Sequence, residues 1–254
     1  MIIDYPYNEA AISLLLDEYK NKVKNGFYHT LQIQFAYNSN HIEGSTLTPE
    51  QTQTIFDKGV IQGQARVQDI AEATNHFRLL DYMLDTLEKE LSEELIREFH
   101  RLLKTNIDND AGEYKRYNNQ IGDGIEPVAT CAASKVPQAM RELLNSYSNS
   151  VEQKTLRDLA AFHHNFEAIH PFQDGNGRVG RVILFRECIR NEVTPFIVQD
   201  LYKNFYYQGL REWSSGKEQR LLETFNMCQE LFYQNSRYFL GFEDTLLRAD
   251  GSEC

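Results

Sequence analysis

Residues 155–190 read TLRDLAAFHHNFEAIHPFQDGNGRVGRVILFRECIR, and they decide how the rest of the chain is interpreted. The first part repeats apolar side chains at steps of three and four residues, which predicts a helix over about 155–169 with one buried face. Proline at 171 disfavours helical geometry at His170, so the helix should end where the histidine is presented. A second helix is expected after the glycines, over residues 178–190. The apolar positions of the first helix are Leu156, Leu159, Phe162, Phe166 and Ile169.

The turn between these two helices has the composition of an anion-binding site. Gly175 and Gly177 lack side chains, so backbone N–H groups can approach phosphate oxygens closely, and the first N–H groups of the next helix point the same way. Arg178 and Arg181 are three residues apart, which puts both guanidinium groups on one side of a helix, where they can contact successive phosphates. Because a helix N-terminus normally favours acids, two arginines here indicate a nearby anion.

Three other polar residues of the turn suit phosphate chemistry. Asp174 is a carboxylate in a cationic pocket, which predicts a hard cation bridging it to phosphate; Mg²⁺ is expected, with Mn²⁺ as the alternative. His170 should be mostly neutral, since an unperturbed imidazole has a pKa of about 6.5, and can accept a proton from a hydroxyl. Asn176 can donate an amide N–H to a phosphoryl oxygen. A metal cluster is the alternative to ordinary packing at His163, His164, Glu167 and His170, since positions 163 and 167 share a helix face.

Residues 170–181 resemble the motif of the Fic family, H-P-F-x-[D/E]-G-N-G-R-x-x-R, at every specified position. At average residue frequencies such a match has a chance on the order of 10⁻¹¹ per window. The resemblance implies a Fic-type helical bundle with a short β-hairpin flap beside the active site. The roles it implies are a general base at His170, a metal ligand at Asp174, a phosphate nest at Gly175, Asn176 and Gly177, clamps on the outer phosphates at Arg178 and Arg181, and a core anchor at Phe172.

The reaction implied by this resemblance is attack of a target Tyr, Thr or Ser hydroxyl on the α-phosphorus of ATP, which releases pyrophosphate and leaves an adenylylated protein. Gly177 favours nucleotidyl transfer, since relatives of the Doc type, which transfer a terminal phosphate, carry a lysine there. Transfer of UMP or another phosphate-linked group is less favoured. Exposed tyrosines of this chain leave self-modification open.

A second match lies upstream, where Ser39 to Gly44 read SNHIEG and resemble the family's inhibitory motif, [S/T]-x-x-x-E-[G/N]. A carboxylate at Glu43 placed beside Arg181 would pair with the guanidinium and repel the γ-phosphate of ATP. The resemblance therefore implies an autoinhibited transferase. In some relatives the same glutamate serves the reverse, de-AMPylating hydrolysis, and a catalytically silent nucleotide-binding module is a further alternative.

Helical periodicity outside the motif predicts a mainly α fold. Helices are expected at about 28–43, from a capping box at Thr48-Pro49-Glu50-Gln51, and at 65–88, 92–107, 137–149, 202–214 and 217–240. The segment 112–135 contains Gly-Asp-Gly and a β-compatible run, which predicts a hairpin, and the resemblance makes about 119–134 the flap that binds the protein substrate. The family's G-x-[aromatic]-R pattern fits GEYKR only if its basic residue is Lys115 or Arg116, so neither receives a role.

Composition limits the other functions. A net charge of −11 argues against a nucleic-acid surface, and the four cysteines are far apart and show neither a disulfide framework nor a zinc pattern. The beginning of the chain lacks the basic region of a secretory leader, and no apolar run approaches the length of a membrane span, so we expect a cytoplasmic protein without membrane contact. A homo-oligomer is left open. The expected domains are an N-terminal inhibitory segment over 1–60, a Fic core over 61–200, and helices over 201–254 that complete the core.

Overall fold

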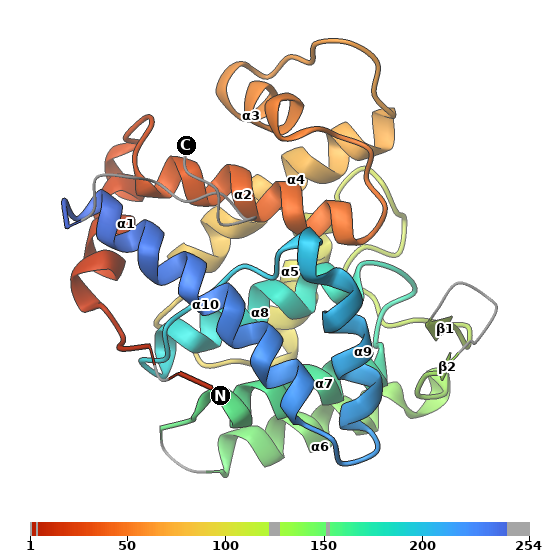
Figure 1. The fold of residues 1–254 in the computed structure, drawn as a ribbon. Helices are drawn as coiled ribbons and strands as arrows, with labels where there is room; N and C mark the ends of the chain where they lie inside the picture. Colours follow the sequence, from red (N-terminus) through yellow and green to blue (C-terminus); the bar gives the residue numbers. More distant parts are fainter. Residues whose placement is uncertain (1, 4, 122–127, 151–152, 243–254) are drawn as a thin grey trace.

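The computed structural model describes residues 2–3, 5–121, 128–150 and 153–242, which fold into helices packed around a central helix, α8 (Figure 1). The predicted mainly α fold with a short hairpin is confirmed. The elements are α1 (Glu9–Asn21), α2 (Phe27–Ile42), α3 (Pro49–Lys58), α4 (Val67–Asp85), α5 (Glu93–Lys104), β1 (Gln120–Ile121), β2 (Val128–Ala129), η1 (Ala133–Lys135), α6 (Val136–Ser148), α7 (Leu156–Ile169), α8 (Asn176–Arg190), η2 (Asp200–Tyr202), α9 (Lys203–Trp213) and α10 (Gln219–Phe239).

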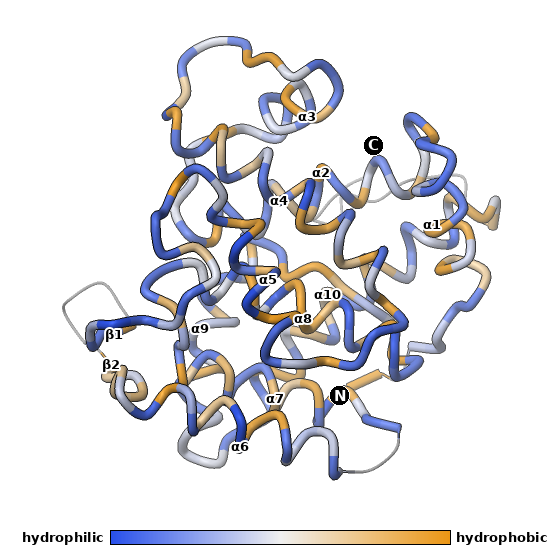
Figure 2. The backbone as a smooth tube through the Cα atoms, turned by 180° about the vertical axis from the view of Figure 1, so that it is seen from behind, coloured by the Kyte–Doolittle hydropathy of each residue, from blue (hydrophilic) through white to orange (hydrophobic). Residues whose placement is uncertain are grey.

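Helix α8 forms the core because it is enclosed by α2, α4, α5 and α7. Almost all of its side chains are buried, including Arg178, Arg181 and Arg186. This helix therefore lacks the solvent-exposed polar face of an ordinary surface helix. Figure 2 shows the apolar colouring concentrated around α8 and α5, with polar segments outside. Residues of α8 are thus held by neighbours from distant parts of the sequence.

Helix boundaries follow the capping signals in the sequence. Thr48 and Gln51 form the predicted capping box of α3, and the Ser92 side chain caps α5. Helix α7 begins with an unpredicted capping box at Thr155, in which Asp158 completes the exchange. Helix α8 begins at Asn176, two residues before the predicted start at 178, so Gly177 lies within the first helical turn. Helix α1 was not predicted from its short apolar run.

The predicted hairpin consists of the antiparallel pair β1 and β2, with Gln120 opposite Ala129 and Ile121 opposite Val128. It projects from the helical body near the C-terminal end of α7 (Figure 1). The Gly-Asp-Gly sequence that predicted its turn lies at 122–124, outside the described residues.

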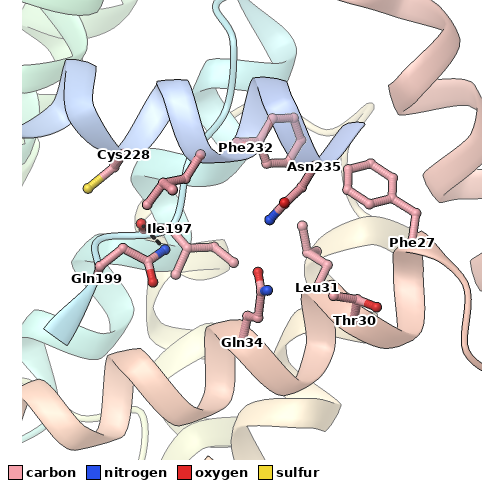
Figure 3. A pocket seen from close by; sticks show the side chains of 10 residues that line it. Phe27, Thr30, Leu31, Gln34, Ile197, Gln199, Cys228, Phe232 and Asn235 are labelled. Carbon is pink, nitrogen blue, oxygen red and sulfur yellow. Dashed lines mark hydrogen bonds between the residues drawn. The ribbon is translucent and has the colours of Figure 1, made fainter. Parts of the chain in front are cut away.

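Helix α2 crosses the molecule and joins the N-terminal segment to the core. Its first half packs against α10 around a small cavity of about 20 Å³, enough for roughly one water molecule (Figure 3). Leu31 and Gln34 of α2 face Phe232 and Asn235 of α10 across this cavity. The second half of α2 contacts α8. Helix α2 is therefore part of the packed core at both ends.

Helices α9 and α10 pack on each other, and α10 also contacts α7. The end of the predicted segment 201–254, residues 243–254, lies outside the described part of the chain. Within the described ranges, no helix has the length and apolar character needed to cross a membrane.

Candidate active site

The turn after α7 presents His170 in a strained, left-handed conformation. Its φ is 51° and its ψ is 63°, and its N–H donates to the Phe166 carbonyl at 2.9 Å, so the histidine closes the helix as a C-terminal cap. Proline at 171 prevents the helix from continuing. A non-glycine residue in this region needs support from its surroundings, which the next residues of the turn supply.

Phe172 and Asn176 fix the shape of the turn. The Phe172 ring is fully buried and stacks on the His100 ring, with centroids 3.8 Å apart. The Asn176 side chain accepts from the Phe172 N–H at 2.8 Å and donates to the Phe172 carbonyl at 2.9 Å. The anchor predicted at Phe172 is in place, while both polar atoms of the Asn176 side chain hold the turn closed. The direct contact of Asn176 with phosphate stays a prediction.

His100 of α5 contacts the turn, and the hydrogen-bond partners of His100 indicate its protonation state. Its Nδ1 accepts from the Gly112 N–H at 2.9 Å, so the proton resides on Nε2, which donates to the Asp174 carbonyl at 3.0 Å. Burial lowers the pKa of His100 to about 4, which keeps this neutral tautomer. Sequence inspection missed His100, because nothing in its local pattern marks it.

His170 itself is neutral. Burial lowers the pKa of its imidazole to about 4, and the nearby Lys115 ammonium acts in the same direction. A hydrogen bond to the backbone of Glu167 acts in the opposite direction but is the smaller effect. A neutral imidazole can accept a proton, and the role of His170 as general base stays a prediction.

Asp174 is ionised and partly exposed. Burial raises the pKa of this carboxyl, but Arg178 and the Lys104 hydrogen bond more than offset that effect and leave the pKa at about 2. The Lys104 ammonium lies 2.5 Å from Asp174 Oδ2 and 3.4 Å from Glu72 Oε1. More than half of the Asp174 side chain remains exposed, so oxygen ligands can still reach it.

The first motif arginine, Arg178, is bound by carboxylates of the core. Its Nη1 lies 2.5 Å from Glu72 Oε2 of α4, and its Nη2 lies 3.3 Å from Asp174 Oδ2. Glu72 and Arg178 are both buried, so this pair is shielded from water. Arg178 Nη1 also donates to Asn40 Oδ1 of α2 at 3.5 Å. The predicted clamp of Arg178 on phosphate stays a prediction. Glu72 and Lys104 were missed from the sequence, as both lie on helices far upstream.

The second motif arginine, Arg181, is bound by the inhibitory motif. Its Nη2 donates to Glu43 Oε1 at 2.8 Å and to the Ser39 carbonyl at 2.8 Å, and its Nε donates to Ser39 Oγ at 3.0 Å. Ser39 and Glu43 are four residues apart, so the end of α2 presents them on one face. The structure brings together the two sequence matches, which are separated by more than a hundred residues.

Two glycines make this contact sterically compatible. Gly44 has a φ of 93° and ends the turn that presents Glu43, a conformation that favours glycine. At Gly177, an added Cβ would lie 2.2 Å from Glu43 Oε1 and 2.9 Å from Arg181 Nη1. The Glu43 carboxylate thus lies directly over the first turn of α8, in contact range of the glycine that the motif specifies.

The N-terminus of α8 offers an anion site at the same place. The first N–H groups of a helix have no acceptor within it. Those of Asn176, Gly177 and Arg178 have none elsewhere in the described part of the chain. Gly175, with a φ of 83°, turns the chain into this helix. Backbone N–H groups at a helix start can bind an anion, and the phosphate nest at residues 175–177 stays a prediction.

The alternative metal cluster at His163, His164, Glu167 and His170 is not formed: no group of three potential ligands occurs among the described residues. His163 Nε2 lies 2.8 Å from the Tyr206 hydroxyl instead. Glu167 is buried against Gly180, where an added Cβ would lie 2.3 Å from its Oε1, and burial raises its pKa to about 8. Glu167 is therefore a protonated acid close to Arg181.

A helical domain with a turn of this type is similar to known proteins. A model of the Fic/DOC family matches residues 90–187. Over 200 residues the chain is 26% identical to "Protein adenylyltransferase Fic" of Drosophila yakuba, covering 78% of this chain and 40% of the relative. The corresponding protein of Drosophila willistoni is 27% identical over 201 residues, with the same coverage. The chain spans less than half the length of these curated relatives.

Solved structures agree on the fold. A Fic domain containing signaling protein from Bacteroides thetaiotaomicron has a TM-score of 0.77 and 23% identity, covering 92% of this chain and 99% of that chain. Residues 90–187 of this chain thus match the Fic/DOC family model, and the chain shares the fold of that Fic domain containing protein.

Proposed function

We propose that the chain is an autoinhibited protein adenylyltransferase that transfers AMP from ATP to a Tyr, Thr or Ser hydroxyl of a target protein. The observation that carries this proposal is the contact of Glu43 with Arg181, 2.8 Å long, over the first turn of α8. The names of the curated relatives support adenylyl transfer as the reaction.

In the proposed reaction, the target hydroxyl oxygen forms a bond to the α-phosphorus of ATP, the bond between that phosphorus and the α–β bridging oxygen breaks, and pyrophosphate leaves. The hydroxyl proton passes to the neutral imidazole of His170. The backbone N–H groups at the start of α8 stabilise the charge on the phosphoryl oxygens. The products are an adenylylated side chain and pyrophosphate.

Asp174 fits a Mg²⁺ ion that arrives with ATP. It is a single ionised carboxylate with more than half of its side chain exposed. This suits Mg²⁺ (or Mn²⁺), which keeps several waters and takes its remaining ligands from phosphates. When bound, the ion would neutralise phosphate charge. Arg181 would clamp the outer phosphates, and the hairpin edge at β1 and β2 would bind an extended segment of the target.

Autoinhibition follows from competition for Arg181. The Glu43 carboxylate already pairs with this guanidinium, so an arriving γ-phosphate would lose its cation and meet a like charge. Ser39 adds two acceptors on the same guanidinium, which holds it toward α2. ATP would then bind without correct placement of its α-phosphorus.

The test compares the wild type with Glu43→Gly and His170→Ala, incubated with α-³²P-labelled ATP and Mg²⁺, with label in protein as the readout. We expect label transfer to rise at least about tenfold in Glu43→Gly, because a coupling of about 1.4 kcal/mol is released, and to disappear in His170→Ala. Glu94→Ala, at an exposed glutamate of α5, is the matched control and should behave as the wild type. Absence of label in Glu43→Gly would overturn the proposal.

The same samples separate the alternatives. A de-AMPylating hydrolase would release AMP from a modified protein only while Glu43 is present, the opposite dependence. A silent nucleotide-binding module would bind ATP in both variants and label nothing.

A further inference from the structure

Lys115 is a buried lysine between α5 and β1, in the segment where the sequence left the role of a basic residue open. The residue is 4% exposed, and burial lowers the pKa of its ammonium to about 8. Its neighbour Arg116 points outward instead: about two thirds of its side chain is exposed, and it pairs with Asp110 at 3.0 Å. The inward basic position of this segment is therefore 115.

The Lys115 ammonium connects the hairpin to the end of α7. It donates to Asn119 Oδ1 and to Thr130 Oγ1, both at 2.7 Å, and to the Ile169 carbonyl at 3.3 Å. Asn119 directly precedes β1 and Thr130 directly follows β2, so the cation lies at the base of the hairpin. The Ile169 carbonyl belongs to the last turn of α7, where the helix favours a cation.

The backbone of Lys115 holds the other side of the histidine. Its N–H donates to the Pro171 carbonyl at 2.8 Å. Ile169 and Pro171 flank His170, so Lys115 forms hydrogen bonds with the chain on both sides of this left-handed residue. Asn119 extends the connection, since its Nδ2 donates to the Phe172 carbonyl at 3.1 Å. The base of the hairpin and the His170 turn are therefore one hydrogen-bonded unit.

We propose that Lys115 is a positioning residue that fixes the His170 turn to the base of the hairpin, so that a target segment bound at the hairpin is held at a set distance from the imidazole. This inference rests on the proposed function, in which the hairpin binds the target and His170 accepts its proton. All three acceptors of the ammonium are neutral oxygens, so its contacts are directional hydrogen bonds.

The charge of Lys115 gives the proposal a pH signature. The titratable groups that face the ammonium are the Cys131 thiol, after β2, and the His170 imidazole, at the end of α7. A lysine with a folded pKa of about 8 loses its charge as the pH rises through that value, and its hydrogen bonds weaken. An arginine remains charged throughout this range.

The experiment places Lys115→Met, Lys115→Arg and the matched control Arg116→Met in the Glu43→Gly protein and measures AMP transfer from pH 6.5 to 9.5. We expect Lys115→Met to lower the rate about tenfold to a hundredfold, mainly in kcat, since misplacement of a base has effects of this size. Lys115→Arg should retain activity and extend it above pH 8, and Arg116→Met should match its parent. Glu167 titrates near the same pH in every variant, so the comparison between variants cancels its contribution.

Two structural readouts show whether a loss comes from positioning or from general unfolding. Hydrogen exchange in Lys115→Met should accelerate at residues 115–121, 128–131 and 168–172 and stay unchanged in α1 and α10. The His170 imidazole should titrate at higher pH in Lys115→Met, because the neighbouring cation is gone, but not in Lys115→Arg.

Full activity of Lys115→Met, or an equal loss in Arg116→Met, would overturn the role of Lys115. Failure of the proposed function looks different, because the Glu43→Gly parent would then transfer no label, while the exchange and titration readouts would still report on the Lys115 connection.

Discussion

Arg178 and Arg181 lie one turn apart on α8, both almost completely buried, yet they form ion pairs with different carboxylates. Arg178 pairs with Glu72 inside the core and with Asp174 in the turn. Arg181 pairs with Ser39 and Glu43, at the end of α2. Arg178 also donates to Asn40 Oδ1 of α2 at 3.5 Å, so both arginines contact α2, but only the ion pair of Arg181 is with a carboxylate at the end of that helix.

The carboxylate partners of the two arginines differ in how much of each side chain is exposed to solvent. The Glu72 side chain is 9% exposed, so the carboxylate that binds Arg178 has little access to water, whereas the Glu43 side chain is 30% exposed. A partner with access to solvent can leave and be hydrated, and a buried one cannot leave without exposing the core. The position of the carboxylate, more than that of the arginine, determines which pair can act as a switch.

The variant Glu72→Ala tests most directly whether the buried ion pair of Arg178 contributes to stability. It leaves Arg178 and Lys104 buried without their shared carboxylate, so we expect a loss of about 3–5 kcal/mol in the free energy of unfolding. Urea unfolding measures this. Glu113→Ala removes a carboxylate that lies 2.6 Å from Arg97 but is more than half exposed, and it should cost less than about 1 kcal/mol. Equal losses in both variants would mean that burial does not distinguish the pairs.

The two arginines also show how far sequence reasoning reaches. The motif at 170–181, its helices and the inhibitory pattern at 39–44 could be predicted, because their signals are local: spacing, glycines, proline and caps. Glu72, His100 and Lys104 could not, since they contribute single side chains from helices whose own patterns indicate only packing.

The partners of the two arginines could not be predicted from the sequence either. Three-residue spacing correctly places Arg178 and Arg181 near one another on α8, but their partners depend on which helices pack there, a tertiary property. The basic residue before the hairpin shows the same limit: Lys115 and Arg116 are adjacent in sequence, and only the packed structure shows that the first points inward.

The variant Glu167→Gln tests the electrostatic environment of Arg181. Burial raises the pKa of Glu167 to about 8 from 4.5, with Arg181 opposing and Glu43 adding to the shift. Between these pH values the folded state holds a proton that the unfolded chain releases, so this contribution is intact below about pH 4.5 and is lost as the pH rises through 8. Relative to the wild type, Glu167→Gln should gain on the order of 3 kcal/mol in unfolding free energy between pH 5 and pH 8.

The control and the combined variant for that measurement follow from the same charges. Glu94→Gln, at an exposed position, should show no relative change between the two pH values. Adding Glu43→Ala removes the neighbouring negative charge and leaves Arg181 to stabilise the Glu167 carboxylate, so the pH effect should shrink. A pH-independent difference between Glu167→Gln and wild type would show that Glu167 is ionised beside Arg181.

The smallest expected effect comes from Ser39→Ala, which removes one acceptor from Arg181 and leaves Glu43 and the Ser39 carbonyl in place. Ser39 is fully buried and alanine fills nearly the same space, so we expect a loss of about 1 kcal/mol in unfolding free energy, with Ser146→Ala on the exposed face of α6 as the control. Because the lost hydrogen bond also helps to hold the guanidinium toward α2, label transfer should rise by only a few-fold, well below Glu43→Gly. A rise as large as that of Glu43→Gly would place the restraint in the serine hydroxyl rather than in the carboxylate.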